Sequence, residues 1–130
     1  MREILFRGKT KVYNKWVYGW YCGKILNHDM HSTEESSQII DDKTLYWHTC
    51  EPETCGQFTG LTDKNGKKIF EGDIVRNGNY TMIVVLYDFH AAFMLAFRVD
   101  GDYFEAISNS HICLEVIGNI HDNPELLESP

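Results

Sequence analysis

The strongest local signals of the chain lie in the stretch Gly56-Gln57-Phe58-Thr59-Gly60-Leu61-Thr62-Asp63-Lys64-Asn65-Gly66-Lys67-Lys68-Ile69-Phe70-Glu71-Gly72-Asp73-Ile74-Val75. Asn65-Gly66 between apolar flanks predicts a hairpin, because these residues most easily supply the two positive φ angles of a type I′ turn. Gly72 predicts a second turn, after which Ile74 and Val75 begin another apolar run. The stretch therefore predicts turn, strand, turn and strand.

The sequence on either side of this stretch predicts a mainly β fold in two parts. Residues 1–60 form an N-terminal β subdomain with a mobile polar loop near 27–38, and residues 61–130 form the second part. The Gly72-Asp73 start, a short turn and a following Val-rich strand are typical of small SH3-like barrels. We therefore expect an N-terminal β subdomain packed on a C-terminal SH3-like barrel. Asn123 and Pro124 predict a short C-terminal helix.

Length and composition are those of an ordinary soluble protein. The 130 residues are 43% hydrophobic and 24% charged, which suits one domain or two small subdomains sharing a core. The longest apolar runs, Met82–Tyr87 and Ala91–Phe97, are far shorter than the roughly 20 residues of a membrane helix. Residues 1–8 carry only a three-residue apolar block and predict no signal peptide. We expect a cytoplasmic protein with its four cysteines reduced.

An aromatic stripe supplies the first candidate binding residues. Trp16, Tyr18 and Trp20 share one face of a predicted strand, where they could stack the bases of a single-stranded nucleic acid. Such stripes are more often core and cross-strand packing, and no basic groove accompanies this one in the sequence. We interpret the stripe as core. As surface residues, the three aromatic side chains together with Lys67 and Lys68 are the candidates for binding.

Metal-ligating side chains gather near Pro52. His48, Cys50 and Cys55 offer the imidazole and thiolates that tetrahedral zinc prefers. A structural site needs a fourth ligand, and no second Cys-x-x-Cys pair is present. The pattern therefore favours free cysteines flanking a turn, and we expect neither a metal nor another cofactor.

Catalytic signatures are missing from the sequence. The chain has no Gly-rich phosphate loop, no His-Glu-x-x-His and no Gly-x-Ser-x-Gly, so we expect no enzyme. The formal net charge of −7 argues against nonspecific binding of nucleic acid, because Lys and Arg supply most of that affinity.

The chain resembles the YopX family over nearly its full length. The resemblance lies in the segments Arg2 to Lys9, Trp16-Val17-Tyr18-Gly19, Pro52-Glu53-Thr54, Gly56 to Leu61, Asp63 to Val75 and Val116 to Leu126. It implies a mainly β protein with a C-terminal SH3-like barrel, encoded by a phage or prophage and acting in the bacterial cytoplasm. It implies no activity, and Cys50, Cys55 and the loop near 27–38 look particular to this member.

Three hypotheses of function remain at this stage. The first is a noncatalytic binding or adaptor module for a host or phage protein, with self-association through sheet edges. The second is a nucleic-acid-binding protein that uses the SH3-like half, or an acidic mimic of nucleic acid. The third is a structural zinc protein that uses the ligands near Pro52.

Overall fold

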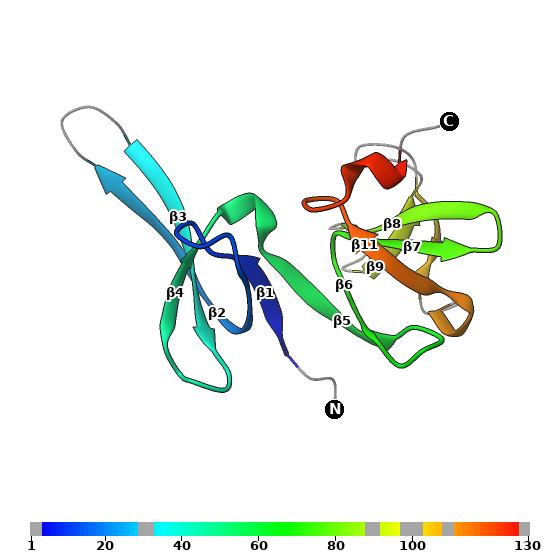
Figure 1. The fold of residues 1–130 in the computed structure, drawn as a ribbon, viewed down its shortest axis with the longest axis horizontal. Helices are drawn as coiled ribbons and strands as arrows, with labels where there is room; N and C mark the ends of the chain where they lie inside the picture. The colour runs from blue at the N-terminus through cyan, green and yellow to red at the C-terminus, as the bar shows by residue number, and fades with distance from the viewer. Residues whose placement is uncertain (1–3, 29–32, 88–91, 97–102, 108–110, 128–130) are drawn as a thin grey trace. The chain divides into compact units, whose positions relative to one another are not determined.

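The computed structural model describes residues 4–28, 33–87, 92–96, 103–107 and 111–127. The chain forms two compact units, residues 1–58 and 59–130. Strand β5 (Gly56–Thr62) begins in the first unit, where its first two residues pair with β1, and ends in the second unit beside β6. Most described residues lie in antiparallel strands, as the mainly β prediction requires (Figure 1).

The first unit is an antiparallel sheet formed by β1, β2, β3, β4 and the start of β5. The strands run over Phe6–Lys9, Trp16–His28, Thr33–Asp41 and Trp47–Cys50, and a 3-10 helix at Pro52–Thr54 precedes β5. Their spatial order is β4-β3-β2-β1-β5, so β1 to β4 each pair with their neighbour in the chain, and β5 pairs with β1 and not with β4. Alternation fills the inner face with Val17, Ile39 and Cys50, against which Phe6, Tyr21 and Cys55 pack.

An isolated β-bridge connects the end of β4 to the residue that follows β1. Thr10 pairs with Cys50, and two backbone bonds flank the pair, from Lys11 N–H to Thr49 C=O and from Glu51 N–H to Lys9 C=O. The interior that results is narrow at Gly8, where an added Cβ would lie 2.8 Å from Ile39 Cδ1. The sheet therefore needs glycine at this position for close packing.

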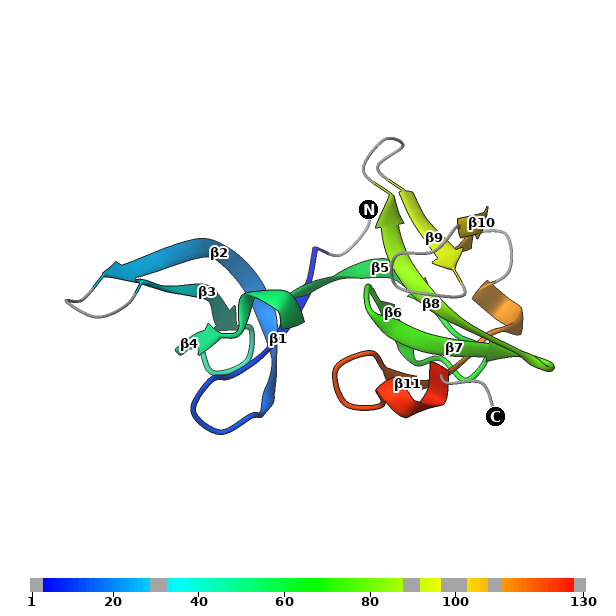
Figure 2. The ribbon, with the colours of Figure 1, turned by 90° about the horizontal axis from the view of Figure 1, so that it is seen from above.

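The long β2–β3 hairpin corrects the expected loop near 27–38. Its ladder runs from Gly19 opposite Asp41 to His28 opposite Thr33, with a bulge between Tyr21 and Gly23. Figures 1 and 2 show its outer part extending beyond β1 and β4. The loop prediction is wrong for residues 27–28 and 33–38, because pairing between β2 and β3 makes strands of a polar segment that lacks apolar alternation. Residues 29–32 lie outside the described part of the chain.

The second unit holds β6 and a five-stranded antiparallel sheet. The order of the sheet is β10-β9-β8-β7-β11. Strand bounds are Lys68–Phe70 for β6, Asp73–Asn77 for β7, Tyr80–Tyr87 for β8, Ala92–Ala96 for β9, Tyr103–Ala106 for β10 and Glu115–Asn119 for β11. A 3-10 helix at His111–Cys113 precedes β11.

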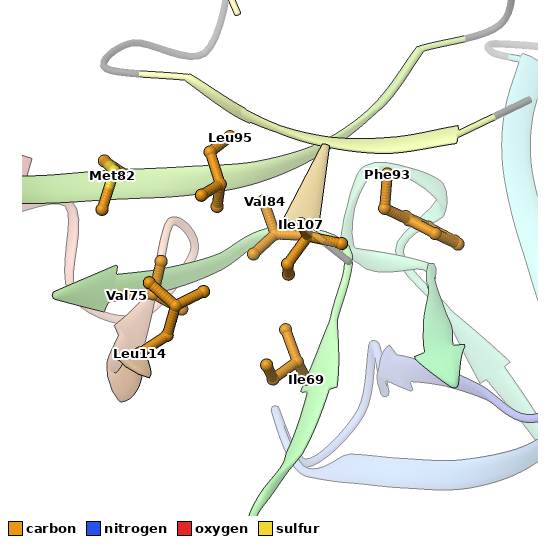
Figure 3. Packing of buried hydrophobic residues seen from close by; sticks show 8 residues of the cluster. All are labelled: Ile69, Val75, Met82, Val84, Phe93, Leu95, Ile107 and Leu114. Carbon is orange, nitrogen blue, oxygen red and sulfur yellow. The ribbon is translucent and has the colours of Figure 1, made fainter. Parts of the chain in front are cut away.

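One hydrophobic cluster fills this unit. Its eight buried residues are Ile69, Val75, Met82, Val84, Phe93, Leu95, Ile107 and Leu114. Figure 3 shows that their side chains come from β6 to β9 and from the segments after β10 and before β11. Leu61, Leu86 and Val116 pack against the cluster. Ile69 and Val75 come from the stretch 56–75, so that stretch contributes to the core of the second unit.

The hairpin at Asn65-Gly66 forms with a different turn from the predicted one. Only Gly66 has a positive φ, +81°, whereas a type I′ turn requires a positive φ at Asn65 as well. Asp63 C=O accepts from Gly66 N–H at 3.0 Å, and Asp63 N–H donates to Lys67 C=O at 2.8 Å. Gly66 therefore follows a tight turn and takes the left-handed conformation, whereas Asn65 does not.

The C-terminal helix is a single 3-10 segment at Pro124–Leu127. The Asn123 side chain does not act as an N-cap among the described contacts. Instead its Oδ1 accepts from the backbone N–H of Asn119 at 3.2 Å and joins the end of β11 to the turn. No helix in the described ranges is long and apolar enough to cross a membrane.

Candidate binding face on the first unit

The outer face of the first unit carries a set of aromatic and basic side chains that alternate with the inner core residues. We define the outer face by Arg7, Lys9, Trp16, Tyr18, Trp20, Ile40 and Trp47. Cross-strand partners share one face of a sheet, and the register pairs Lys9 with Trp16, Arg7 with Tyr18, and Ile40 with both Trp20 and Trp47.

Three aromatic rings of the outer face are exposed. The exposed fractions are 41% for Tyr18, 47% for Trp20 and 63% for Trp47. The interpretation of the stripe as core is therefore wrong for Tyr18 and Trp20. Its physical reason is that Val17 and Tyr21, on the alternate positions of β2, already face the inner cluster.

Trp20, Ile40 and Trp47 form one continuous row across three strands. Ile40 on β3 lies directly opposite Trp20 on β2 and Trp47 on β4. Within the described part of the chain, neither indole N–H donates a hydrogen bond and neither ring makes a ring contact. The row is exposed apolar surface with two indole donors that make no bond to described residues, an arrangement suited to a partner with apolar side chains and carbonyl acceptors.

Two cations border the row on the β1 side. The Arg7 guanidinium carbon lies 4.8 Å from the centroid of the Trp16 ring, and Lys9 Nζ lies 5.9 Å from it. Arg7 is only 6% exposed, so the aromatic ring and the guanidinium stabilise each other away from water. Trp16 is thus held in place as a flank of the outer face and is less open than the row.

The acidity of the chain is concentrated in the other unit. Residues 1–58 hold seven Lys and Arg against eight Asp and Glu, a formal charge of −1, whereas residues 59–130 hold five against eleven, a charge of −6. The net charge of −7 therefore does not describe the first unit. It also weakens the case for nucleic-acid binding by the second unit, whose charge repels phosphates.

Lys67 and Lys68 do not belong to the outer face. Both are exposed beside the hairpin turn of the second unit, whereas Trp16, Tyr18 and Trp20 lie in the first unit. Lys67 N–H donates to Asp63 Oδ1 at 2.9 Å, so its backbone has a role in the turn. The structure therefore separates the five candidate binding residues into two groups.

His48, Cys50 and Cys55 lie near one another in the chain. No group of three or more His, Cys, Asp or Glu side chains that could hold a metal occurs among the residues that the structure describes. Cys50 is fully buried, and burial, with neighbouring Cys55, raises the pKa of its thiol to about 12. Burial likewise raises the pKa of Cys55. Thiols of this kind stay protonated at neutral pH, and they pack in the core as small hydrophobes.

Sequence reasoning missed two members of the row, Ile40 and Trp47. Trp47 stands in a short strand whose composition is visible in the sequence. Its alignment with Trp20 depends on two separate strand pairings, which local alternation does not report. The available signal was the abundance of aromatic residues at 44–49 beside a polar turn.

Comparison with known proteins places the chain in a family. The family model described as YopX protein matches residues 5–128. The crystal structure of protein EF1440 from Enterococcus faecalis is similar, with 22% identity, a TM-score of 0.54, and coverage of 98% of this chain and all of that one. This likeness concerns the fold, and no curated protein matches the chain. The chain belongs to the YopX family.

Proposed function

We propose that the protein is a noncatalytic protein-binding or adaptor module whose contact surface is the outer face of the first unit. The observation that carries the proposal is the row Trp20–Ile40–Trp47, an exposed apolar strip built on paired strands. Proteins rarely leave several large aromatic rings together in solvent unless the surface is used. Rings held by a sheet also lose little conformational entropy on binding.

The composition of the outer face supports a protein as the partner. Binding energy in protein interfaces concentrates in Trp, Tyr and Arg at the centre of the contact, with a polar rim around them. Trp20 lies on β2 inside the sheet and Trp47 on its edge strand β4, while Lys9 and the turn after β3 supply charged surroundings. A partner that covers the row removes both indoles from water.

The experiment is affinity capture with purified full-length protein from lysate of a bacterial host, followed by a binding titration with the recovered protein. The Trp20→Ala and Trp47→Ala variants are compared with Tyr80→Ala, which removes an exposed ring in the second unit. We expect each Trp variant to weaken binding by about tenfold or more and Tyr80→Ala to leave it unchanged. Recovery of only the protein itself would replace the proposal by self-association, which light scattering measures.

A second candidate is stacking of a single-stranded nucleic acid on the same face. Arg7 and Lys9 on β1 lie beside Trp16 and Tyr18, which brings cations to an aromatic stripe, the combination that single-strand binders use. The burial of Arg7 and the charge of −1 in this unit count against it. Gel shifts whose affinity falls steeply with salt would favour it, and no shift at low salt would end it.

We also propose that the second unit is an SH3-like small barrel and that the protein is phage- or prophage-encoded and acts in the cytoplasm of a bacterial host. The order β11-β7-β8-β9-β10, with a 3-10 helix before the last strand, supports the barrel. Membership of the YopX family supports the cellular setting. Expression from an induced prophage, detected in the cytoplasmic fraction by mass spectrometry, tests the setting.

A further inference from the structure

We infer that the row Trp20–Ile40–Trp47 takes a proline-rich, basic peptide segment in the polyproline II conformation, lying across the strands. The inference rests on the proposed protein-binding function and names the chemistry of the partner. Three features carry it: the spacing of the Cα atoms of the two tryptophans, their indole donors that make no bond to described residues, and the carboxylates of the turn beside the row.

The spacing follows from the strand pairing. Asp42 N–H donates to Tyr18 C=O, so alternate residues of β3, Ile40 included, direct their backbone groups at β2. Trp20–Ile40 is then a hydrogen-bonded pair and Ile40–Trp47 a non-hydrogen-bonded pair. Their Cα separations of about 5.5 and 4.5 Å place the two tryptophans about 10 Å apart.

A polyproline II helix repeats over a matching distance. It has three residues per turn and rises about 3.1 Å per residue, so residues i and i+3 lie about 9.3 Å apart on one side. Prolines at these positions can therefore each contact one indole, with Ile40 beneath the intervening turn. The preformed helix also loses little conformational entropy on binding, which suits a flat sheet without a deep pocket.

Hydrogen bonding fits the same occupant. A polyproline II backbone has no internal hydrogen bonds, and all its carbonyl groups accept from the surroundings. Trp20 and Trp47 each offer an indole N–H that donates to no other described residue, and an indole nitrogen is a donor only. An extended strand added to a sheet edge would use backbone donors instead, and the row lies on a face.

Charge favours a basic peptide. Asp42 is exposed and lies two positions after Ile40, just beyond the end of β3. Its backbone N–H donates to Tyr18 C=O, so Asp42 lies on the β2 side of the turn. The Asp41 carboxylate in the same turn accepts from the N–H groups of Lys43 and Thr44, and these bonds lower its pKa and keep it charged. A Lys or Arg between the two prolines lies over Ile40 and is attracted to these two carboxylates.

The test is fluorescence anisotropy with a dye-labelled twelve-residue probe of repeated Pro-Pro-Lys, titrated with full-length protein. A Pro-Pro-Glu repeat keeps the helix and reverses the charge, and a Gly-Ser-Lys repeat keeps the charge and removes the helix. We expect saturable binding of the first probe and about tenfold weaker binding of each of the others. Trp47→Ala should weaken the first probe about tenfold, and Tyr80→Ala should leave it within twofold.

Several results would overturn the inference. Equal binding of the two lysine probes would show simple charge attraction, and equal binding by wild type and Trp47→Ala would place the contact elsewhere. The face would be assigned to nucleic acid if a single-stranded oligonucleotide displaces the Pro-Pro-Lys probe and the Gly-Ser-Lys probe binds as tightly as the Pro-Pro-Lys probe. If the proline probes fail while Trp47→Ala still weakens the captured partner, the protein-binding function stands and this inference alone is wrong. Circular dichroism spectra confirm the fold of each variant.

Discussion

Removing the Asp63 carboxylate is expected to destabilise the second unit more than removing any exposed charge. Its Oδ1 accepts from the backbone N–H groups of Asn65 at 2.8 Å and Lys67 at 2.9 Å, and its Oδ2 accepts from Val116 N–H at 2.9 Å. The side chain is 6% exposed and joins the hairpin turn to β11. One carboxylate therefore connects backbone segments more than fifty residues apart.

The magnitude follows from these three bonds. Hydrogen bonds to a charged group contribute about 1.5–3 kcal/mol each, so about 5–9 kcal/mol is an upper bound for the three. Desolvation of the carboxylate costs several kcal/mol, and we expect Asp63→Ala to lower the free energy of unfolding by about 3 kcal/mol. Asp63→Asn keeps one carbonyl oxygen for the turn but turns a donor toward Val116 N–H, and should cost about 2 kcal/mol.

Urea denaturation followed by far-ultraviolet circular dichroism measures both variants, with Glu125→Gln as the control that removes an exposed carboxylate. The control should change the free energy of unfolding by less than about 0.5 kcal/mol. A loss below about 1 kcal/mol for Asp63→Ala would refute the claim that this carboxylate holds β11 to the turn.

The pH dependence has a definite sign. Burial raises the pKa of Asp63, but the N–H groups of Val116, Lys67 and Asn65 outweigh burial, and the pKa falls below its ordinary value. The folded state thus holds its proton less tightly than the unfolded chain, whose pKa is about 3.9. The stabilisation is complete above that value and is lost as pH falls through the folded pKa. The stability difference between wild type and Asp63→Asn should therefore shrink in acid, and a constant difference would contradict the assignment.

Three further predictions concern the cores and the thiols. Gly8→Ala should cost about 1–3 kcal/mol, because its Cβ would lie 2.8 Å from Ile39 Cδ1; tryptophan fluorescence in urea reports it, and an unchanged midpoint would contradict the narrow interior. Gly66→Ala should cost about 1–2 kcal/mol from its φ of +81° although space is open, and circular dichroism in urea showing no loss would contradict the turn assignment. A chromogenic disulfide reagent at pH 8 should label the exposed Cys22 and Cys113 quickly and Cys50 only on unfolding, since the Cys50 thiol has a pKa of about 12; prompt labelling of Cys50 would exclude its burial.

The strands were predictable where apolar alternation was strong. The runs around Trp16, Ile74 and Met82 all form strands, as their β-branched and aromatic residues indicate. The segment Thr33–Gln38 gave no such signal, because its polar side chains carry no alternation and its strand depends on the ladder with β2. Local pattern cannot report a pairing that the partner strand supplies.

The exposure of the aromatic stripe could not be predicted for a related reason. Alternation shows that Tyr18 and Trp20 share a face, but not which face of the sheet the rest of the unit covers. The close approach of Gly8 to Ile39 and Cys50 settles this, since it leaves the inner face filled by small and branched residues. The turn at Gly66 also differs from the predicted type I′ turn. The Asp63 carboxylate accepts from Asn65 N–H and Lys67 N–H, and these bonds select the local conformation.

We propose that Trp20 and Trp47 are the residues through which the protein binds a partner protein. The most direct measurement is the affinity of wild type and Trp47→Ala for the purified partner recovered by affinity capture, determined by isothermal titration calorimetry beside the Tyr80→Ala control. We predict a loss of about tenfold or more for Trp47→Ala and an unchanged affinity for the control. Equal affinities of wild type and Trp47→Ala for that partner would contradict the claim.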